Sequence, residues 1–154
     1  MSALLKISDA AAIGLHAVVL MAGAPRQVFS AARLAEDLNV SRNHLVKVMQ
    51  RLARAGLLRA VRGPSGGYLL AVPPGQITLR QVMEALEGRM MPAGCLLKHP
   101  VCGGPCLLGA VFEAVNQQLL PFFSQTNVAG LAALLSARAA GGNAAKTAGR
   151  RRPA

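Results

Sequence analysis

The sequence contains no tryptophan, one tyrosine and four phenylalanines, so large aromatic side chains contribute little to its core. The interior must instead be built mainly from Ala, Leu, Val and Met, within a chain that is 53% hydrophobic. Acidic residues are also scarce, because 6 Asp and Glu stand against 17 Lys and Arg, which gives a formal net charge of +11. A chain of 154 residues has room for one core domain plus short appendages. Its positive field favours nucleic acid as the partner, with an anionic membrane surface as the alternative.

A long apolar run is missing too. No stretch reaches the roughly eighteen residues that a membrane-spanning helix needs, and the nearest, residues 10–24, is interrupted by His16 and closed by Pro25. It also lacks the basic flank and cleavage site of a signal peptide. Three cysteines cannot pair internally without a remainder, which argues against a secreted disulfide framework. We therefore expect a cytoplasmic protein without a membrane segment.

Capping residues and apolar periodicity predict a mostly α fold with a small β-hairpin. Ser8, Ser30, Ser41 and Thr78 each stand where a helix is expected to begin. The expected helices are a first one ending near residues 23–25, then residues 31–38, a third ending at Gly56, and residues 78–87. Strands are expected at residues 57–61 and 68–72, joined by a Gly-rich turn. This order predicts a winged helix-turn-helix.

Basic residues concentrate where such a fold would meet DNA. Residues 42–62 hold six basic side chains and no acidic one. The N-terminal end of a recognition helix enters the major groove, which makes Ser41, Arg42, Asn43 and His44 the candidates for base contacts. Lys47 and Arg51 are expected to meet phosphates further along the helix. The wing would reach the minor groove or its backbone through Arg62, Gly63, Ser65 and Gly66. Double-stranded DNA is the predicted partner.

The cysteines are confined to one short Pro/Gly-rich segment, as Cys95, Cys102 and Cys106. Thiolates at this spacing can converge on an iron–sulfur cluster, or on zinc if a histidine completes the set. Reduced thiols that form one disulfide as a switch are the alternative without a metal. The candidates for a fourth ligand are His99 within the segment, and His16 or Asp9 on the first helix. In a symmetric dimer, that helix of one subunit could reach the cysteine segment of the other.

Several motifs resemble the bacterial iron–sulfur winged-helix repressors, which include the iron–sulfur-cluster regulator and the nitric-oxide-sensitive repressor. They are residues 41–47 (Ser-Arg-Asn-His-Leu-Val-Lys), residues 61–68 (Val-Arg-Gly-Pro-Ser-Gly-Gly-Tyr), and Glu87-Gly88 followed by the three cysteines. The resemblance covers residues 5–135 and implies a homodimer in which Cys95, Cys102 and Cys106 hold a 2Fe–2S or 4Fe–4S cluster. The second cysteine gap is shorter than is usual in the family. The first-helix carboxylate of the nitric-oxide sensors falls at Ala12, whereas the histidine of a redox-sensing relative falls at His16, which becomes the preferred fourth ligand.

An apolar stripe after the cysteines predicts the dimer. It comprises Leu107, Leu108, Val111, Phe112, Val115, Leu119 and Leu120, which a small winged domain cannot bury alone. Pro121 should kink or end this helix, and a last helix is expected over residues 128–137. The organisation is thus a winged domain (1–88), a cysteine loop (89–106), dimerisation helices (107–138) and a disordered basic tail (139–154). A transcriptional repressor, not an enzyme, is the expected function, because only His99 lies near enough to activate a nucleophilic cysteine. A partly palindromic operator would fit a two-fold dimer.

Overall fold

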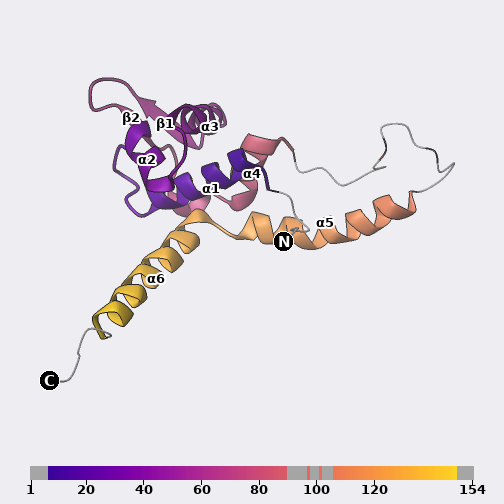
Figure 1. The fold of residues 1–154 in the computed structure, drawn as a ribbon. Coiled ribbons are helices and arrows are strands. Elements are labelled where there is room, and N and C mark those ends of the chain that lie inside the picture. Colours follow the sequence, from indigo (N-terminus) through magenta and orange to yellow (C-terminus); the bar gives the residue numbers. More distant parts are fainter. Residues whose placement is uncertain (1–6, 90–96, 98–100, 102–105, 149–154) are drawn as a thin grey trace.

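The computed structural model describes residues 7–89, 97, 101 and 106–148. In order, these form α1 (Asp9–Ala22), α2 (Ala31–Leu38), α3 (Arg42–Arg54), β1 (Leu58–Val61), β2 (Gly67–Leu70), the 3-10 turn η1 (Pro74–Gln76), α4 (Leu79–Glu87), α5 (Leu107–Gln125) and α6 (Val128–Ala148). The first seven elements gather into one domain, from which α5 and α6 extend in different directions (Figure 1). The predicted fold class, mostly helical with a β-hairpin, is confirmed.

Side-chain caps explain where the helices begin. The hydroxyls of Ser8, Ser30 and Ser41 each accept a hydrogen bond from a backbone N–H three residues on, at 3.1–3.2 Å. Thr78 does the same for α4 and forms a capping box with Gln81. Each cap satisfies a donor that a free helix end would leave unpaired. All four predicted helix starts are therefore confirmed.

The helix-turn-helix follows from a short left-handed turn. Asn39 ends α2 with a φ of 52° in the left-handed region, and Ser41 already caps α3. Asparagine tolerates that conformation better than most residues with a side chain. The turn lets α2 pack on α3, and the apolar side of α3 is buried through Leu45, Val48, Met49 and Leu52.

The wing is an antiparallel hairpin in which Leu58 pairs with Leu70 and Val61 with Gly67. The strands are shorter than the predicted segments at 57–61 and 68–72. An additional bridge joins Tyr68 to Phe29, with hydrogen bonds of 2.8 and 2.9 Å in both directions. The hairpin is thus attached to the segment that precedes α2.

The core centres on α1, which packs against α3, α4 and α6. Val18, Met21, Leu34, Leu45, Met49 and Leu86 are among its fully buried side chains. Gly14 permits the close approach of α1 and α4, since a Cβ there would collide with the side chain of Leu86. Among residues 7–89 and 106–148, the core contains aliphatic and sulfur side chains and no fully buried aromatic one, as the composition indicated.

Two backbone hydrogen bonds fasten the α5–α6 junction to the winged domain. The N–H of Leu79 donates to the carbonyl of Thr126 at 3.0 Å, and the N–H of Val128 donates to the carbonyl of Ile77 at 2.8 Å. Thr78 and Asn127 thereby form an isolated β-bridge. The junction is held by main-chain groups as well as by side-chain packing.

The positions where the C-terminal helices end differ from part of the sequence expectations. α5 continues through Pro121 to Gln125, so of the two expected effects of this proline, a kink or an end, the end does not occur. α6 continues to Ala148, although a disordered tail was predicted from residue 139. Alanine has the highest helix propensity, which explains how this Ala-rich segment extends the helix. Among the helices of the described residues, none combines the length and apolar character that crossing a bilayer requires.

Candidate nucleic-acid interface and cysteine segment

The start of α3 presents the residues predicted to contact bases. Ser41, Arg42 and Asn43 are exposed, His44 is half-buried, and Lys47 is exposed one turn further on. The Oγ of Ser41 accepts the N–H of His44 at 3.1 Å, which leaves its hydroxyl proton available to a DNA acceptor. In the major groove, Arg42 can form a bidentate pair of hydrogen bonds with guanine, and Asn43 can form one with adenine. The structure therefore brings these five predicted residues together on one exposed surface.

Glycine geometry shapes the wing tip. Gly63 has a φ of 115°, and its carbonyl accepts the N–H of Gly66 at 2.9 Å. A Cβ on Gly66 would lie 2.8 Å from the carbonyl oxygen of Gly63, which is too close for any other residue. Arg62 and Ser65 are exposed beside this tight turn. The wing tip therefore combines the positive charge of Arg62 with a turn that is slim enough to enter a DNA groove.

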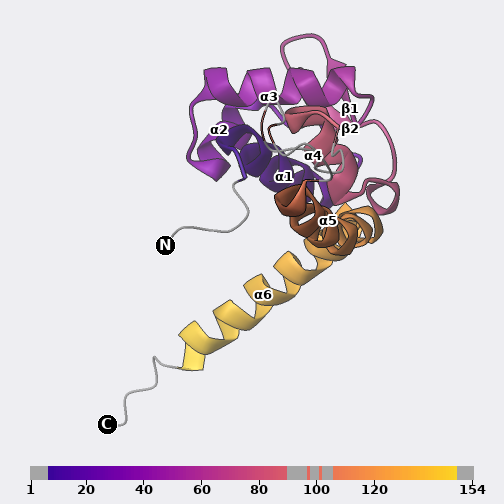
Figure 2. The same ribbon diagram turned by 90° about the vertical axis from the view of Figure 1, so that its right-hand side faces the viewer.

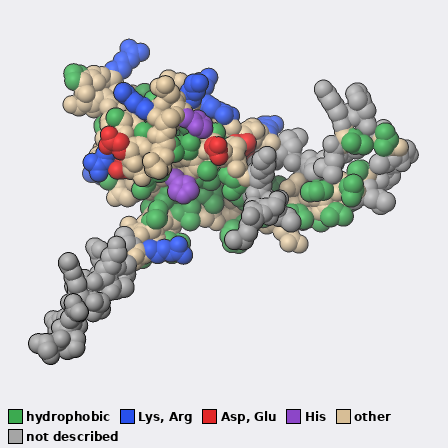
Figure 3. Space-filling model, in the orientation of Figure 1, with side chains coloured by type: hydrophobic (Ala, Val, Ile, Leu, Met, Phe, Trp, Pro, Cys, Tyr) green, Lys and Arg blue, Asp and Glu red, His purple; other side chains and the backbone are tan. Residues whose placement is uncertain are grey.

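The two DNA-facing elements lie on the same side of the molecule. α3 and the wing occupy one side, and α6 extends toward the opposite one (Figure 2). Lys and Arg side chains gather along the α3 and wing edge, whereas acidic side chains lie on lower parts of the domain (Figure 3). This distribution gives the α3 and wing surface a positive field suited to a phosphate backbone.

Arg51 has a structural contact that the sequence did not indicate. Its guanidinium donates a hydrogen bond to the backbone carbonyl of Leu86, in the last turn of α4, and the side chain is half-buried. The phosphate contact predicted for Arg51 remains a prediction beside this observed role. No sequence signal could have revealed the partner, because it is a main-chain group 35 residues away.

A second bond reaches the same end of α4. The hydroxyl of Ser8, at the start of α1, donates to a carboxylate oxygen of Glu87. The last turn of α4 is thus bonded to both α1 and α3, immediately before Gly88 and the segment that carries the cysteines. Gly88 has a φ of 89°, which ends the helix.

The structure describes one of the three cysteines. Cys106 is half-buried and caps α5, where its sulfur accepts the N–H of Gly109 at 3.3 Å. Negative charge on a sulfur at this position is favoured by the helix dipole and by the N–H donors. Cys95, Cys102 and His99 lie outside the described residues. Within the described part of the chain, no group of three or more His, Cys, Asp or Glu side chains is placed to hold a metal ion.

The candidate ligands on α1 are exposed and lie far from Cys106 in the same chain. His16 and Asp9 are both solvent-exposed. The Nδ1 of His16 lies 2.7 Å from the carbonyl oxygen of Ala12. The first turn of α5, which Cys106 caps, lies at the end of that helix remote from α1 (Figure 1). One chain therefore does not bring His16 and Cys106 together.

Comparison with known proteins identifies the family. The Rrf2 family model, described as "Iron-dependent Transcriptional regulator", matches residues 7–134. An HTH-type regulator of Neisseria meningitidis serogroup A, NMA1593, is 36% identical over 87 residues, covering 56% of this chain and 59% of the relative. BadM of Rhodopseudomonas palustris, also named as an HTH-type transcriptional regulator, is 37% identical over 83 residues, covering 54% and 53%. The chain thus spans little more than half the length of these curated relatives.

Solved structures extend the similarity through the C-terminal helices. CymR of B. subtilis, titled the global cysteine regulator, matches with a TM-score of 0.72 and 25% identity, covering 85% of this chain and 98% of CymR. IscR of T. potens matches with a TM-score of 0.67 and 26% identity, covering 83% and 86%. The family match, the winged helix-turn-helix and the basic recognition surface agree. The chain belongs to the Rrf2 family of DNA-binding transcriptional regulators.

Proposed function

We propose that the chain is a homodimeric, cytoplasmic repressor whose affinity for its operator is gated by an iron–sulfur cluster held by Cys95, Cys102 and Cys106. The donor set fits such a cluster, since thiolates are its usual ligands and an imidazole can complete the set. The iron-dependent description of the family and the similarity to IscR support the proposal. When bound, the cluster would supply reversible redox chemistry and sensitivity to nitric oxide or iron shortage.

The observation that carries the gating is the bonding at the end of α4. The cysteine segment begins directly after this turn, which Arg51 of α3 and Ser8 of α1 both contact. A change in the conformation of the segment would move the carbonyl of Leu86. The hydrogen bond from Arg51 would transmit this movement to α3, the recognition helix. Operator affinity then changes because the two states of the segment hold α3 in different positions.

His16 is the proposed fourth ligand, contributed across the dimer. A hydrogen bond from Nδ1–H to the carbonyl of Ala12 leaves the Nε2 lone pair of an exposed imidazole available to a metal. Because α1 and the start of α5 are far apart in one chain, His16 of the partner subunit is the one that would complete the set. Asp9 and His99 are the alternatives.

Exposed apolar residues support the homodimer. Leu108 and Val111 are each 62% exposed in the single chain, and Phe112 and Val115 are also exposed. Such a stripe on one helix gains stability by packing on its two-fold mate. A dimer would carry two recognition helices and read a partly palindromic operator.

A thiol switch without iron is the second candidate. It is favoured by the similarity to Staphylococcus aureus CymR in its oxidized form, with a TM-score of 0.69 and 27% identity. The sulfur of Cys106 lies at a helix N-terminus, a position that promotes the reactive thiolate. Zinc bound by the same residues would be a structural variant of this candidate.

Anaerobic purification distinguishes these candidates. The proposal expects a coloured protein that contains iron and acid-labile sulfide, and a Cys102→Ala variant that loses the visible absorption. Nitric oxide should bleach the wild-type spectrum and weaken its footprint on a palindromic operator. A colourless protein with three titratable thiols, or with stoichiometric zinc, and with unaltered operator binding would refute cluster gating.

A further inference from the structure

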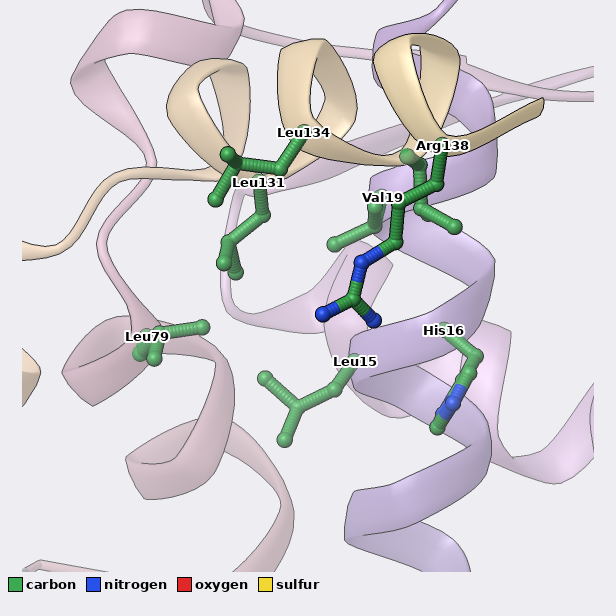
Figure 4. A pocket seen from close by; sticks show the side chains of 8 residues that line it. Leu15, His16, Val19, Leu79, Leu131, Leu134 and Arg138 are labelled. Carbon is green, nitrogen blue, oxygen red and sulfur yellow. The ribbon is translucent and has the colours of Figure 1, made fainter. Parts of the chain in front are cut away.

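A pocket of about 480 Å³ lies where α1, α4 and α6 meet (Figure 4). Its walls are aliphatic: Leu15 and Val19 from α1, Leu79 from α4, and Leu131, Leu134 and Leu135 from α6. Leu134 and Leu135 are 63% and 48% exposed, so large apolar surfaces of the pocket face water. Sites for small ligands typically have this size, this apolar lining and only a few polar groups.

Arg138 supplies the charge of the pocket. Its guanidinium extends from α6 into the space above Leu15, and His16 lies at the edge (Figure 4). None of the described residues that line the pocket is acidic. The ion pairs found among the described residues, Arg33–Asp37 and Arg80–Glu84, do not include Arg138. An aliphatic cavity therefore carries a cation that has no carboxylate partner in the described part of the chain.

We propose that this pocket binds a small amphipathic carboxylate, with its aliphatic body between α1 and α6 and its carboxylate on Arg138. A cationic ligand would be repelled by the guanidinium, and a compact polyanion would leave the leucine walls exposed. The lining residues that the structure describes include no aromatic ring, which favours a flexible alkyl chain over a stacked planar ligand. The apolar stripe of α5 is separate from this pocket, and the partner's cysteine segment, which the proposed function brings to His16, would reach only the edge of the pocket.

The proposal is tested with alkyl ligands of equal length and different head groups. Calorimetric titration of the full-length protein should show binding of octanoate, weaker binding of octanol and no binding of octylamine. Affinity should rise about three- to fourfold for each added CH₂ until the pocket is full. Loss of the charge-assisted hydrogen bond in Arg138→Gln should lower octanoate affinity about tenfold and leave octanol affinity unchanged.

Two further variants keep the test specific. Arg33→Gln removes an arginine outside the pocket and should bind octanoate as the wild type does. Leu134→Ser shortens an exposed wall residue and should weaken octanoate and octanol equally. Octanoate binding that is unchanged in Arg138→Gln, or equal binding of octylamine, would overturn the proposal. So would dissociation of a dimer by octanoate, because a second copy of the chain would then occupy the pocket.

The pocket proposal and the cluster proposal can be refuted independently. His16→Ala should lower cluster retention while octanoate affinity stays within about twofold of the wild type, since His16 lies only at the edge of the pocket. A protein that binds octanoate but never iron would refute the cluster alone. A protein that holds iron but binds no carboxylate would refute the pocket alone.

Discussion

At the scale of single residues, Gly67 shows how closely the wing is packed. A Cβ at this position would lie 2.7 Å from the carbonyl carbon of Phe29, within the bridge that attaches the hairpin to the domain. We expect Gly67→Ala to lower the free energy of unfolding by about 2 kcal/mol, the usual cost of forcing extra volume into a packed site. Urea denaturation measures this loss.

Gly75→Ala is the matched control for that substitution. Gly75 is exposed, and a Cβ there would meet nothing within 4 Å. Its unfolding free energy should stay within about 0.5 kcal/mol of the wild type. Equal losses in the two variants would show that the close contact with Phe29 is not the cause.

Substitutions of the exposed residues of α3 can distinguish contacts to bases from contacts to phosphates. Arg42→Ala and Asn43→Ala should each lower affinity for the operator about 10- to 100-fold and affinity for unrelated DNA much less, because a base contact is sequence-specific. Lys47→Ala should weaken both DNAs similarly and reduce the slope of log affinity against log salt by about 1. Fluorescence anisotropy over a range of salt concentrations measures both effects.

Arg33→Ala serves as the control for charge alone. Arg33 is a basic residue on α2 that pairs with Asp37 and lies outside the exposed face of α3. Its removal should leave the preference for the operator over unrelated DNA unchanged. If Arg42→Ala behaved in the same way, Arg42 would not be reading a base.

At the scale of elements, the end of α4 connects the cysteine segment to α3 through Arg51. Arg51→Met keeps an unbranched side chain but removes the donor to the carbonyl of Leu86. We expect a stability loss of about 1 kcal/mol, the net value of such a hydrogen bond. We also expect the ratio of operator affinities between the cluster-loaded and cluster-free proteins to fall toward one.

Arg51→Lys, which retains a donor, should preserve part of that ratio. Anisotropy measurements on both forms of each variant provide the comparison. A wild-type protein with a ratio of one would refute cluster gating itself. A ratio that persists in Arg51→Met would refute only the connection through Leu86.

Local signals predicted the elements well where they were strong. Ser30, Ser41 and Thr78 cap the helices that they were expected to cap, and Gly56 and Gly88 adopt positive φ at helix ends. α6 extends beyond the predicted segment 128–137, because alanine propensity sustains a helix where large apolar residues are absent. Pro121 stays within α5, so of the two predicted outcomes, a kink or an end of the helix, the end did not occur.

The candidate site was only partly accessible to sequence reasoning. The exposed residues of α3 and the wing glycines follow from local patterns, which is why they lie where expected. The bond from Arg51 to Leu86 and the pocket containing Arg138 depend on how distant elements pack. Periodicity and capping contain no information about such contacts. Cys95, Cys102 and His99 lie outside the described residues, and their role remains a prediction.

At the scale of the whole molecule, the exposed apolar stripe of α5 is the surface through which the proposed dimer would form. Val111→Glu places a charge in the exposed stripe that the dimer would bury, and burying an unpaired charge is costly. We expect the dimer dissociation constant to rise at least about 100-fold, with affinity for a palindromic operator falling accordingly. Light scattering after size-exclusion chromatography measures the mass.

Gln117→Glu adds the same charge on α5 at an exposed polar position on the helix face turned away from Val111 and Val115. This variant should remain dimeric. If both variants dissociated, added charge would be responsible and not the stripe. If neither did, the dimer would have to form through another surface.

The main-chain bonds at Thr126 and Val128 have a consequence for operator architecture. They oppose rotation of the winged domain about the end of α5, so the proposed dimer would hold two half-sites at a fixed distance and angle. Inserting one base pair at the centre of the palindrome turns one half-site by about a tenth of a helical turn and shifts it by about 3.4 Å. A dimer with freely jointed winged domains would tolerate that insertion, whereas the proposed dimer should lose most of its cooperative binding.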